Sequence, residues 1–364
     1  MWTNNASRRI LAAVAGVAAI ALGSCGDGEK PAPFSPADLT GSWYLTIFQS
    51  GPAVAAGTAA GWIRGEMVID AAGTGSAVWI EDSSGGAPTV SIPYAIDGSG
   101  VVTSTSPLLP GFLGKMSPSK NLIVATHSSA TGAPERRVLR IYQKIVPGTS
   151  FSAADLVNGA FAYHTALGGA AAGWEHGTAT TDASGVLTLS ARVNPAGPLA
   201  DLPGFTTLSG TTAGVVTASH DPSWKGFVSA DKALVVFSYT ESLADHRYGL
   251  IVVTRSGGTY ALGDIGGAWT LHALVTDTTG AAAWGRGNLS VGATGAFAFS
   301  SWLDSSGQTT APDPSTFAVA SDGTVTMPAQ AQASFHGSLA PGKQLLVATG
   351  DGDVDAHALF LAVR

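Results

Sequence analysis

The sequence predicts an all-β protein made of three repeats of about 110 residues. The first observation is a block of the form aromatic-x-Gly-x-apolar-small-x-x-Lys-x-Leu. It occurs three times, and its lysines, Lys120, Lys232 and Lys343, are 112 and 111 residues apart. The second is a succession of short apolar stretches broken by Gly, Ser, Asp and Pro clusters. The third is composition: 47 glycines and only 12% charged residues favour buried sheets over a helical bundle with a charged exterior.

Further markers recur in the same order within each repeat. Each repeat opens with an acidic residue a few positions before an aromatic one, contains a tryptophan that follows a small residue and precedes a glycine by three positions, and closes on an apolar strand with a basic end. The openings are Asp38 to Trp43, Asp155 to Phe161 and Asp264 to Trp269; the tryptophans are Trp62, Trp174 and Trp284; the basic ends are Lys144, Arg255 and Arg364. These markers place the repeats at 37–147, 148–257 and 258–364.

Each repeat divides into about eight strands. In the first repeat they are WYLTIF, IRGEMVID, GSAVWIED, VSIPYAID, GVVTSTS, FLGKMS, NLIVATHS and VLRIYQKI. The stretches LIVAT, LVVFSY and LLVAT, one in each repeat, are apolar at successive positions instead of alternating. Both faces of these strands are therefore expected to be covered.

Two architectures fit this strand count, and the expected one is a six-bladed β-propeller with two four-stranded blades per repeat. The turns MSPSKNLIVAT and LAPGKQLLVAT resemble the SPDGK-x-L-x-V turn of YVTN-type propeller repeats. That resemblance implies a closed ring of blades, in which both faces of every blade are buried.

The alternative is that each repeat closes into its own eight-stranded barrel. Gly41-x-Trp43 and Gly267-x-Trp269, each with a basic residue on the last strand of its repeat, resemble the calycin pattern of lipocalins and avidins. The second repeat departs from this pattern because Phe161 stands where the tryptophan should be. The resemblance implies tandem calycin-like barrels that enclose ligand cavities.

The first residues form a leader and a tether. Arg8 and Arg9 precede the apolar run 10–22, and Cys25, the only cysteine of the chain, follows. This order predicts a signal peptide over 1–24 and a polar, Pro-rich tether over 25–36. The ending Leu-Gly-Ser-Cys resembles the lipobox of bacterial lipoproteins, which implies that Cys25 becomes the acylated N-terminus. The chain is then anchored in the bacterial cell envelope, at the outer membrane or the periplasmic face of a membrane.

Charge and motif spacing limit the chemistry. Without the leader, 16 basic residues stand against 25 acidic ones, a net charge of −9 that argues against a nucleic-acid partner. No cofactor motif is recognised. Asp351, Asp353 and Asp355 form a candidate cation site, because alternate carboxylates suit Ca²⁺. The Gly and Glu that complete an EF-hand loop are missing, so the alternative is an exposed acidic hairpin.

Two sets of residues invite functional hypotheses. Trp62, Trp174 and Trp284 could form aromatic platforms that stack on a sugar or another flat ligand, or they could wedge between strands as core residues. Glu175 and His176 suggest an acid–base pair, but neighbours on a strand point to opposite faces.

The repeated residues are those that build structure, which favours a non-catalytic, membrane-anchored binding or scaffold lipoprotein for a protein or glycan ligand. The alternatives are a propeller-type hydrolase or lyase acting on a polysaccharide or lactone, and a small-ligand carrier built from tandem barrels.

Overall fold

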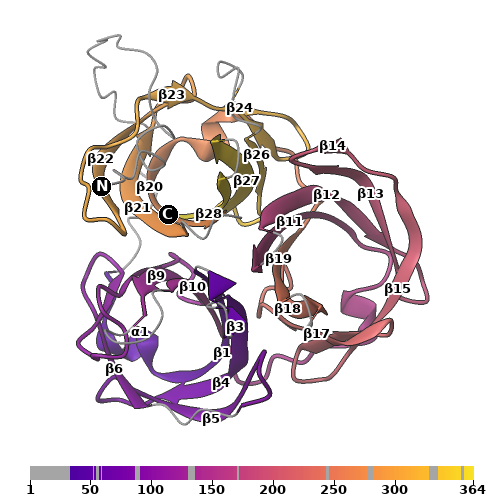
Figure 1. Ribbon diagram of the computed structural model, residues 1–364, viewed down its shortest axis with the longest axis horizontal. Helices are drawn as coiled ribbons and strands as arrows, with labels where there is room; N and C mark the ends of the chain where they lie inside the picture. Colours follow the sequence, from indigo (N-terminus) through magenta and orange to yellow (C-terminus); the bar gives the residue numbers. More distant parts are fainter. Residues whose placement is uncertain are drawn as a thin grey trace.

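The computed structural model describes residues 33–51, 53–54, 57–58, 60–86, 91–129, 136–169, 172–242, 246–277, 282–327, 335–353 and 356–364. Over these residues the chain forms three β-barrels in succession, which Figure 1 shows end on around a common centre. Every strand pair is antiparallel. The helices are single turns, and none among the described residues is long and apolar enough to cross a membrane. Cys25 lies outside the described residues.

Barrel 1 is a closed ring with the strand order β1-β10-β9-β8-β7-β6-β5-β4. It follows the single-turn helix α1 (Pro36–Leu39). Its strands are β1 (Gly41–Ser50), β4 (Gly61–Ile69), β5 (Thr74–Asp82), β6 (Ser91–Ile96), β7 (Val101–Ser104), β8 (Leu113–Met116), β9 (Leu122–Ser128) and β10 (Arg137–Lys144). A two-stranded sheet between β1 and β4 pairs β2 (Ala53–Val54) with β3 (Gly57–Thr58).

Barrel 2 is closed by the pairing of its second and third strands. It contains the short helix η2 (Ala153–Asp155) and the strands β11 (Ala160–Gly169), β12 (Gly173–Thr181), β13 (Val186–Asn194), β14 (Gly197–Pro198), β15 (Leu202–Gly210), β16 (Val215–Ala218), β17 (Asp221–Val228), β18 (Leu234–Ser242) and β19 (Arg247–Arg255).

Barrel 3 is nearly closed, because its two sheet edges, β23 and β24, are separated in the chain by Phe317 alone. It contains the helix η3 (Leu262–Ile265) and the strands β20 (Gly267–Asp277), β21 (Ala283–Val291), β22 (Ala296–Asp304), β23 (Ser315–Thr316), β24 (Ala318–Val319), β25 (Thr324–Thr326), β26 (His336–Leu339), β27 (Leu345–Asp353) and β28 (Ala356–Val363).

The six-bladed propeller is therefore wrong, and the barrel alternative is confirmed. Blades would leave two open sheets in each repeat, whereas β1 pairs with both β4 and β10 and closes the ring. The unalternating strands misled the prediction because a barrel can also cover both faces of a strand. On β9, Ile123 and Ala125 pack inside barrel 1, while Leu122 and Val124 pack outward against the other barrels.

An ion pair between a turn lysine and a helix-capping aspartate lies at one end of each barrel and helps to close it. An aspartate caps the short helix by accepting the backbone N–H three residues earlier, and it pairs with the repeated turn lysine. The pairs are Lys120–Asp38 (3.0 Å), Lys232–Asp155 (2.7 Å) and Lys343–Asp264 (2.8 Å). These lysines adopt φ values of +60°, +61° and +55°, as a tight left-handed turn position requires. The three lysines therefore lie in turns, as the sequence predicts, but the sequence does not indicate that each one pairs with an aspartate.

The basic residue at the end of each repeat completes this closed end. Lys144, Arg255 and Arg364 donate to the backbone carbonyls of Asp38, Asp155 and Asp264, respectively. Each cation also lies over the aromatic residue of the first strand, at 5.2 Å from Trp43, 5.3 Å from Phe161 and 4.7 Å from Trp269. Phe161 thus supplies a cation–π surface, although it lacks the indole N–H that Trp43 and Trp269 donate to the carbonyls of Leu39 and Ile265. In the second repeat the hydroxyl of Thr181 donates to the carbonyl of Leu156 instead.

The outer faces of the three barrels meet in one apolar cluster at the centre of the molecule. Equivalent residues from each barrel contribute, among them Val124, Val236 and Val347, which are all fully buried. A cluster shared in this way removes apolar area from water on the outside of each barrel as well as inside. The barrels therefore form one packed body.

One repeated polar contact between barrels runs in the same direction around the whole ring. The repeated tryptophans donate their indole N–H to the next barrel: Trp62 to Thr240 (3.0 Å), Trp174 to Asp351 (2.5 Å) and Trp284 to Ser128 (3.0 Å). The third barrel thereby returns to the first, as in a closed three-fold ring. Because equivalent contacts relate the barrels by rotation, their closed ends share one face of the molecule.

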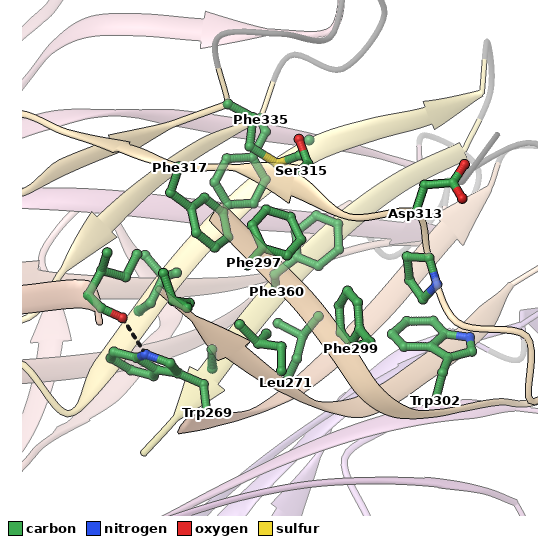
Figure 2. Close-up of a pocket in the computed structure, with 18 of the residues that line it drawn as sticks. Trp269, Leu271, Phe297, Phe299, Trp302, Asp313, Ser315, Phe317, Phe335 and Phe360 are labelled. Atoms are coloured by element: carbon green, nitrogen blue, oxygen red, sulfur yellow. Dashed lines mark hydrogen bonds between the residues drawn. The ribbon is translucent and has the colours of Figure 1, made fainter. Parts of the chain in front are cut away.

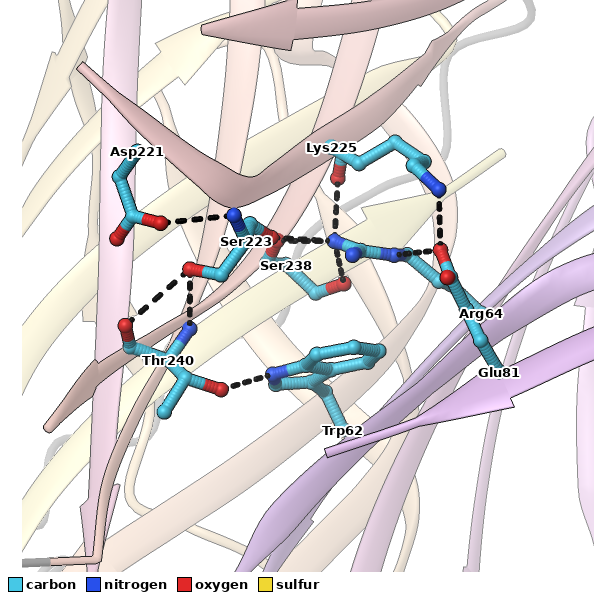
Figure 3. Close-up of polar contacts among 8 residues, drawn as sticks. All are labelled: Trp62, Arg64, Glu81, Asp221, Ser223, Lys225, Ser238 and Thr240. Carbon is cyan, nitrogen blue, oxygen red and sulfur yellow. Dashed lines mark hydrogen bonds and ion pairs between the residues drawn. The ribbon is translucent and has the colours of Figure 1, made fainter. Parts of the chain in front are cut away.

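Two residues beyond each tryptophan, a second side chain crosses the interface. Arg64 is only 3% exposed and enters barrel 2, as Figure 3 shows. Its Nη1 donates to the carbonyls of Ser223 (2.8 Å), Lys225 (3.2 Å) and Ser238 (2.7 Å), and its Nε donates to Glu81 (2.6 Å). One guanidinium therefore holds together two strands of barrel 2 and one of barrel 1.

Replacing Arg64 by Met should destabilise the whole protein by roughly 2–4 kcal/mol, because several buried carbonyls lose their donor. Urea unfolding measures this. Lys225→Met is the matched control: it removes a half-exposed ion pair to the same Glu81 and should cost less than about 1 kcal/mol. Equal costs for the two variants would contradict the role assigned to Arg64.

The interface between barrels 2 and 3 uses histidines instead. His176 occupies the position of Arg64 and stacks on His336, with 4.1 Å between the ring centroids. His164 lies 6.1 Å from His176 and contacts Ser338 (3.0 Å) and Thr349 (3.3 Å) of barrel 3. Burial lowers the pKa of His164 to about 3 and that of His176 to about 4, so both rings are neutral at pH 7.

Acid should therefore weaken this interface. Below the ordinary histidine pKa of about 6.5, the unfolded chain binds protons that folded His164 and His176 refuse, so stability falls as pH drops toward 4. His164→Thr, which copies Thr46 at the equivalent place in barrel 1, should flatten this slope by up to about 1.4 kcal/mol per pH unit. Urea unfolding at pH 7, 6 and 5 measures it.

Leu250→Ala is the control in the same central cluster. It should lower stability at every pH and leave the slope unchanged, because it removes no titratable group. An unchanged slope in His164→Thr would contradict the account.

Candidate functional site

Barrels 2 and 3 enclose cavities, and one difference from barrel 1 that contributes to them lies on the last strand of each repeat. In barrel 1, Tyr142 fills the interior and its hydroxyl lies 3.0 Å from that of Tyr94. The equivalent residues are Val253 in barrel 2 and Ala362 in barrel 3, and each lines its cavity. Removing a large side chain without a compensating one leaves a void. The cavity volumes are about 410 Å³ in barrel 2 and about 130 Å³ in barrel 3.

The cavity of barrel 3 is aromatic and largely apolar. Figure 2 shows the aromatic rings among its lining residues, which include Phe297, Phe299, Phe317, Phe335 and Phe360. Phe297 stacks on Phe317 at 4.2 Å, and Phe299 meets Trp302 edge-on at 5.3 Å. Asp313 and Ser315 also line this cavity. Such a space suits a small apolar molecule.

The cavity of barrel 2 is larger and has a polar group in its wall. Arg192 binds Glu175 through two hydrogen bonds, from Nε (2.8 Å) and Nη2 (2.9 Å), and Tyr163 donates to the same carboxylate (2.6 Å). The hydrogen bonds that Arg192 donates to Glu175 raise the pKa of Arg192, and burial raises the pKa of Tyr163. The guanidinium therefore stays charged and the phenol stays protonated at all physiological pH values. Leucines and phenylalanines toward the closed end supply the apolar part.

One end of this cavity is closed and the other is open. At the closed end, Leu156 of the η2 turn is 4% exposed and Phe161 is covered by Arg255. At the other end, Glu241 is 38% exposed and His220 is exposed. The cavity of barrel 2 therefore opens on the face opposite the helix caps.

The structure places Trp62, Trp174 and Trp284 between barrels, neither in the core of a single repeat nor on an open surface. Their exposed fractions are 6%, 1% and 5%. Since each indole N–H is already donated to the neighbouring barrel, we assign these tryptophans to barrel assembly and not to ligand stacking.

Glu175 and His176 point to opposite sides of β12, as their adjacency predicts. Glu175 lines the cavity of barrel 2, whereas His176 lies in the interface with barrel 3. The side chains of Asp353 and Asp355 lie outside the described residues. Asp351 accepts hydrogen bonds from Trp174 and His357. Among the described residues, no three His, Cys, Asp or Glu side chains gather as a metal site would require.

Comparison with known proteins adds little beyond the barrel architecture. No protein-family model matches the chain, and no curated protein matches it. Similar solved structures include transferrin binding protein B of Neisseria meningitidis serogroup B, 10% identical over 89% of this chain and 77% of that chain, with a TM-score of 0.30. Two variants of the Haemophilus parasuis protein are 11% and 10% identical over 89% of this chain and 75% of theirs, with TM-scores of 0.26. These values carry no argument about function.

Sequence reasoning missed the residues that line the cavities, such as Arg192 and Trp302. A usable indication was present, since the repeats align residue by residue along their last strands. The step from Tyr142 to Val253 and Ala362 removes most of a side chain from an inward-facing position.

Proposed function

We propose that this chain is a lipid-anchored binding protein of the bacterial cell envelope that carries small, largely apolar molecules inside barrels 2 and 3. The observation that carries the proposal is the cavity of about 410 Å³ in barrel 2, closed at one end and open at the other. Cavities of this size and lining are typical of small-molecule sites. The proposal joins two hypotheses from the sequence, the membrane-anchored binding lipoprotein and the tandem-barrel carrier.

The fold also supports an orientation for the cavities. The tether predicted over 25–36 leads into the closed end of barrel 1, where Phe34 donates its backbone N–H to Gly98 (3.2 Å). The closed ends share one face, so the open ends of barrels 2 and 3 point away from the anchored residue. A ligand would then be exchanged with the periplasm or the exterior and not with the anchoring bilayer.

The hypothesis of a propeller-type hydrolase or lyase depends on a propeller fold, and the structure shows barrels instead. Its candidate pair does not converge, because Glu175 is held by Arg192 inside barrel 2 and His176 is turned outward. The binding function needs no such pair.

Filling the cavities should abolish binding. Val253→Tyr and Ala362→Tyr copy the Tyr142 of barrel 1, and a fluorescence titration with the neutral apolar dye N-phenyl-1-naphthylamine measures the effect. The unaltered protein should bind the dye, the double variant should not, and the dye should raise the melting temperature only of the former. Val253→Ala keeps the cavity open and should retain binding. Unchanged binding by a folded double variant would contradict the proposal.

Removing the acyl acceptor should release the protein from the membrane. Cys25→Ser leaves no thiol for acyl chains, whose burial anchors a protein at about 0.8 kcal/mol per CH₂. Membrane fractionation and detergent partitioning measure the change, and Ser24→Ala, which keeps the cysteine, should stay in the membrane fraction. Retention of Cys25→Ser with the membranes would rule out the lipid anchor.

A further inference from the structure

An aromatic wall lines the open end of the cavity in barrel 2. It consists of Phe205, His220, Trp224 and Tyr239, all of which line the cavity. The ring centroids of Trp224 lie 4.3 Å from Tyr239, 4.9 Å from His220 and 5.5 Å from Phe205. Trp224 and Phe205 are only partly buried, so the wall keeps ring surface open to the cavity. Ring faces carry partial negative charge and attract cations.

The charged residues that line the same cavity are mostly acidic. Three carboxylates, Glu175, Asp221 and Glu241, stand against one guanidinium, Arg192. Two of them lie beside the aromatic wall: besides burial, the charges of Glu241 and Glu175 raise the pKa of the Tyr239 hydroxyl. The charge of Arg247, which pairs with Glu241, acts on Tyr239 in the opposite direction, so the potential at the wall is set by the carboxylates, their arginine partners and the ring faces together.

The cations near this end are already engaged. Arg192 gives Nε and Nη2 to Glu175 and Nη1 to the carbonyl of Ala200 (2.8 Å). Arg247 pairs with Glu241 at 2.7 Å. A ligand with a carboxylate or phosphate head would therefore meet acidic oxygens and guanidinium groups that already pair with a carboxylate, which disfavours it.

We propose that barrel 2 selects an apolar molecule that carries a positively charged, alkylated ammonium group. The ammonium lies against Trp224 and Tyr239 within reach of Glu175 and Glu241, and the hydrocarbon part extends toward the closed end. Alkylated ammonium groups suit this wall because they are weakly hydrated and interact with several ring faces at once. This inference rests on the proposed function and adds the charge of the ligand.

The cavity of barrel 3 differs from the cavity of barrel 2 in its carboxylates and in its size. Its aromatic rings line the cavity together with Asp313 and Asp351. Asp351 already accepts hydrogen bonds from Trp174 (2.5 Å) and His357 (2.8 Å). The cavity of barrel 3 is also smaller than that of barrel 2. The substitution Ala362→Tyr should fill the cavity of barrel 3 and leave the aromatic wall of barrel 2 unchanged.

The test compares three twelve-carbon probes, dodecyltrimethylammonium, dodecanol and dodecanoate, below their micelle concentrations, by calorimetric titration of the Ala362→Tyr protein. The trimethylammonium probe should bind about tenfold tighter than dodecanol and tighter still than dodecanoate. Trp224→Leu and Glu241→Gln should each bring the three affinities closer together, while Trp224→Phe should retain part of the preference. Melting temperatures confirm that the variants are folded.

The outcomes separate the two proposals. Binding of all probes with equal affinity, or a preference for dodecanoate, overturns the ammonium inference and leaves apolar binding in place. A preference that survives in folded Trp224→Leu also overturns the assigned wall. Failure of every probe to bind overturns both the inference and the proposed function.

Discussion

The burial of the outer barrel faces at the centre of the ring is the constraint on which the rest of the molecule depends. A free-standing barrel keeps its outer surface polar and must draw its stability from a filled interior. Here Val124, Val236 and Val347 are buried on the outside of their barrels, with equivalent leucines beside them. Because this shared cluster contributes apolar burial, the interiors of barrels 2 and 3 need not be filled. The cavities are thus compatible with a stable fold.

The three interfaces between barrels share the same tryptophan contact, but other residues in the interface differ from one to the next. The tryptophan contact is the same three times, but the residue two positions later is Arg64, His176 or Arg286. The two arginines donate to carbonyls of the neighbouring barrel, whereas the histidine stacks on His336. Sensitivity to acid should therefore arise between barrels 2 and 3, from His164 and His176, and also between barrels 3 and 1, where His272 contacts Thr126 and burial lowers its pKa to about 3. In the same way, one backbone position holds Tyr142, Val253 or Ala362, and the loss of the large side chain contributes to the cavities of barrels 2 and 3.

Much of this fold can be predicted from the sequence. The repeats and the turn lysines follow from local patterns, because left-handed turns and strand breaks depend on nearby residues. The sequence does not distinguish the barrel from the propeller, because unalternating strands such as LIVAT do not show what covers their outer face. A neighbouring barrel covers that face as well as a second blade would. The cavities could not be predicted from any single repeat, since a void depends on side chains from strands that are distant in the sequence, such as Tyr163, Arg192 and Trp224.

Differential scanning calorimetry of the chain without its leader tests most directly the claim that the three barrels share one core. The account predicts a single transition whose calorimetric and van't Hoff enthalpies agree, because no barrel can leave the ring without exposing the central cluster. Separate transitions, or a calorimetric enthalpy about three times the van't Hoff value, would show that the barrels unfold independently and would contradict the account.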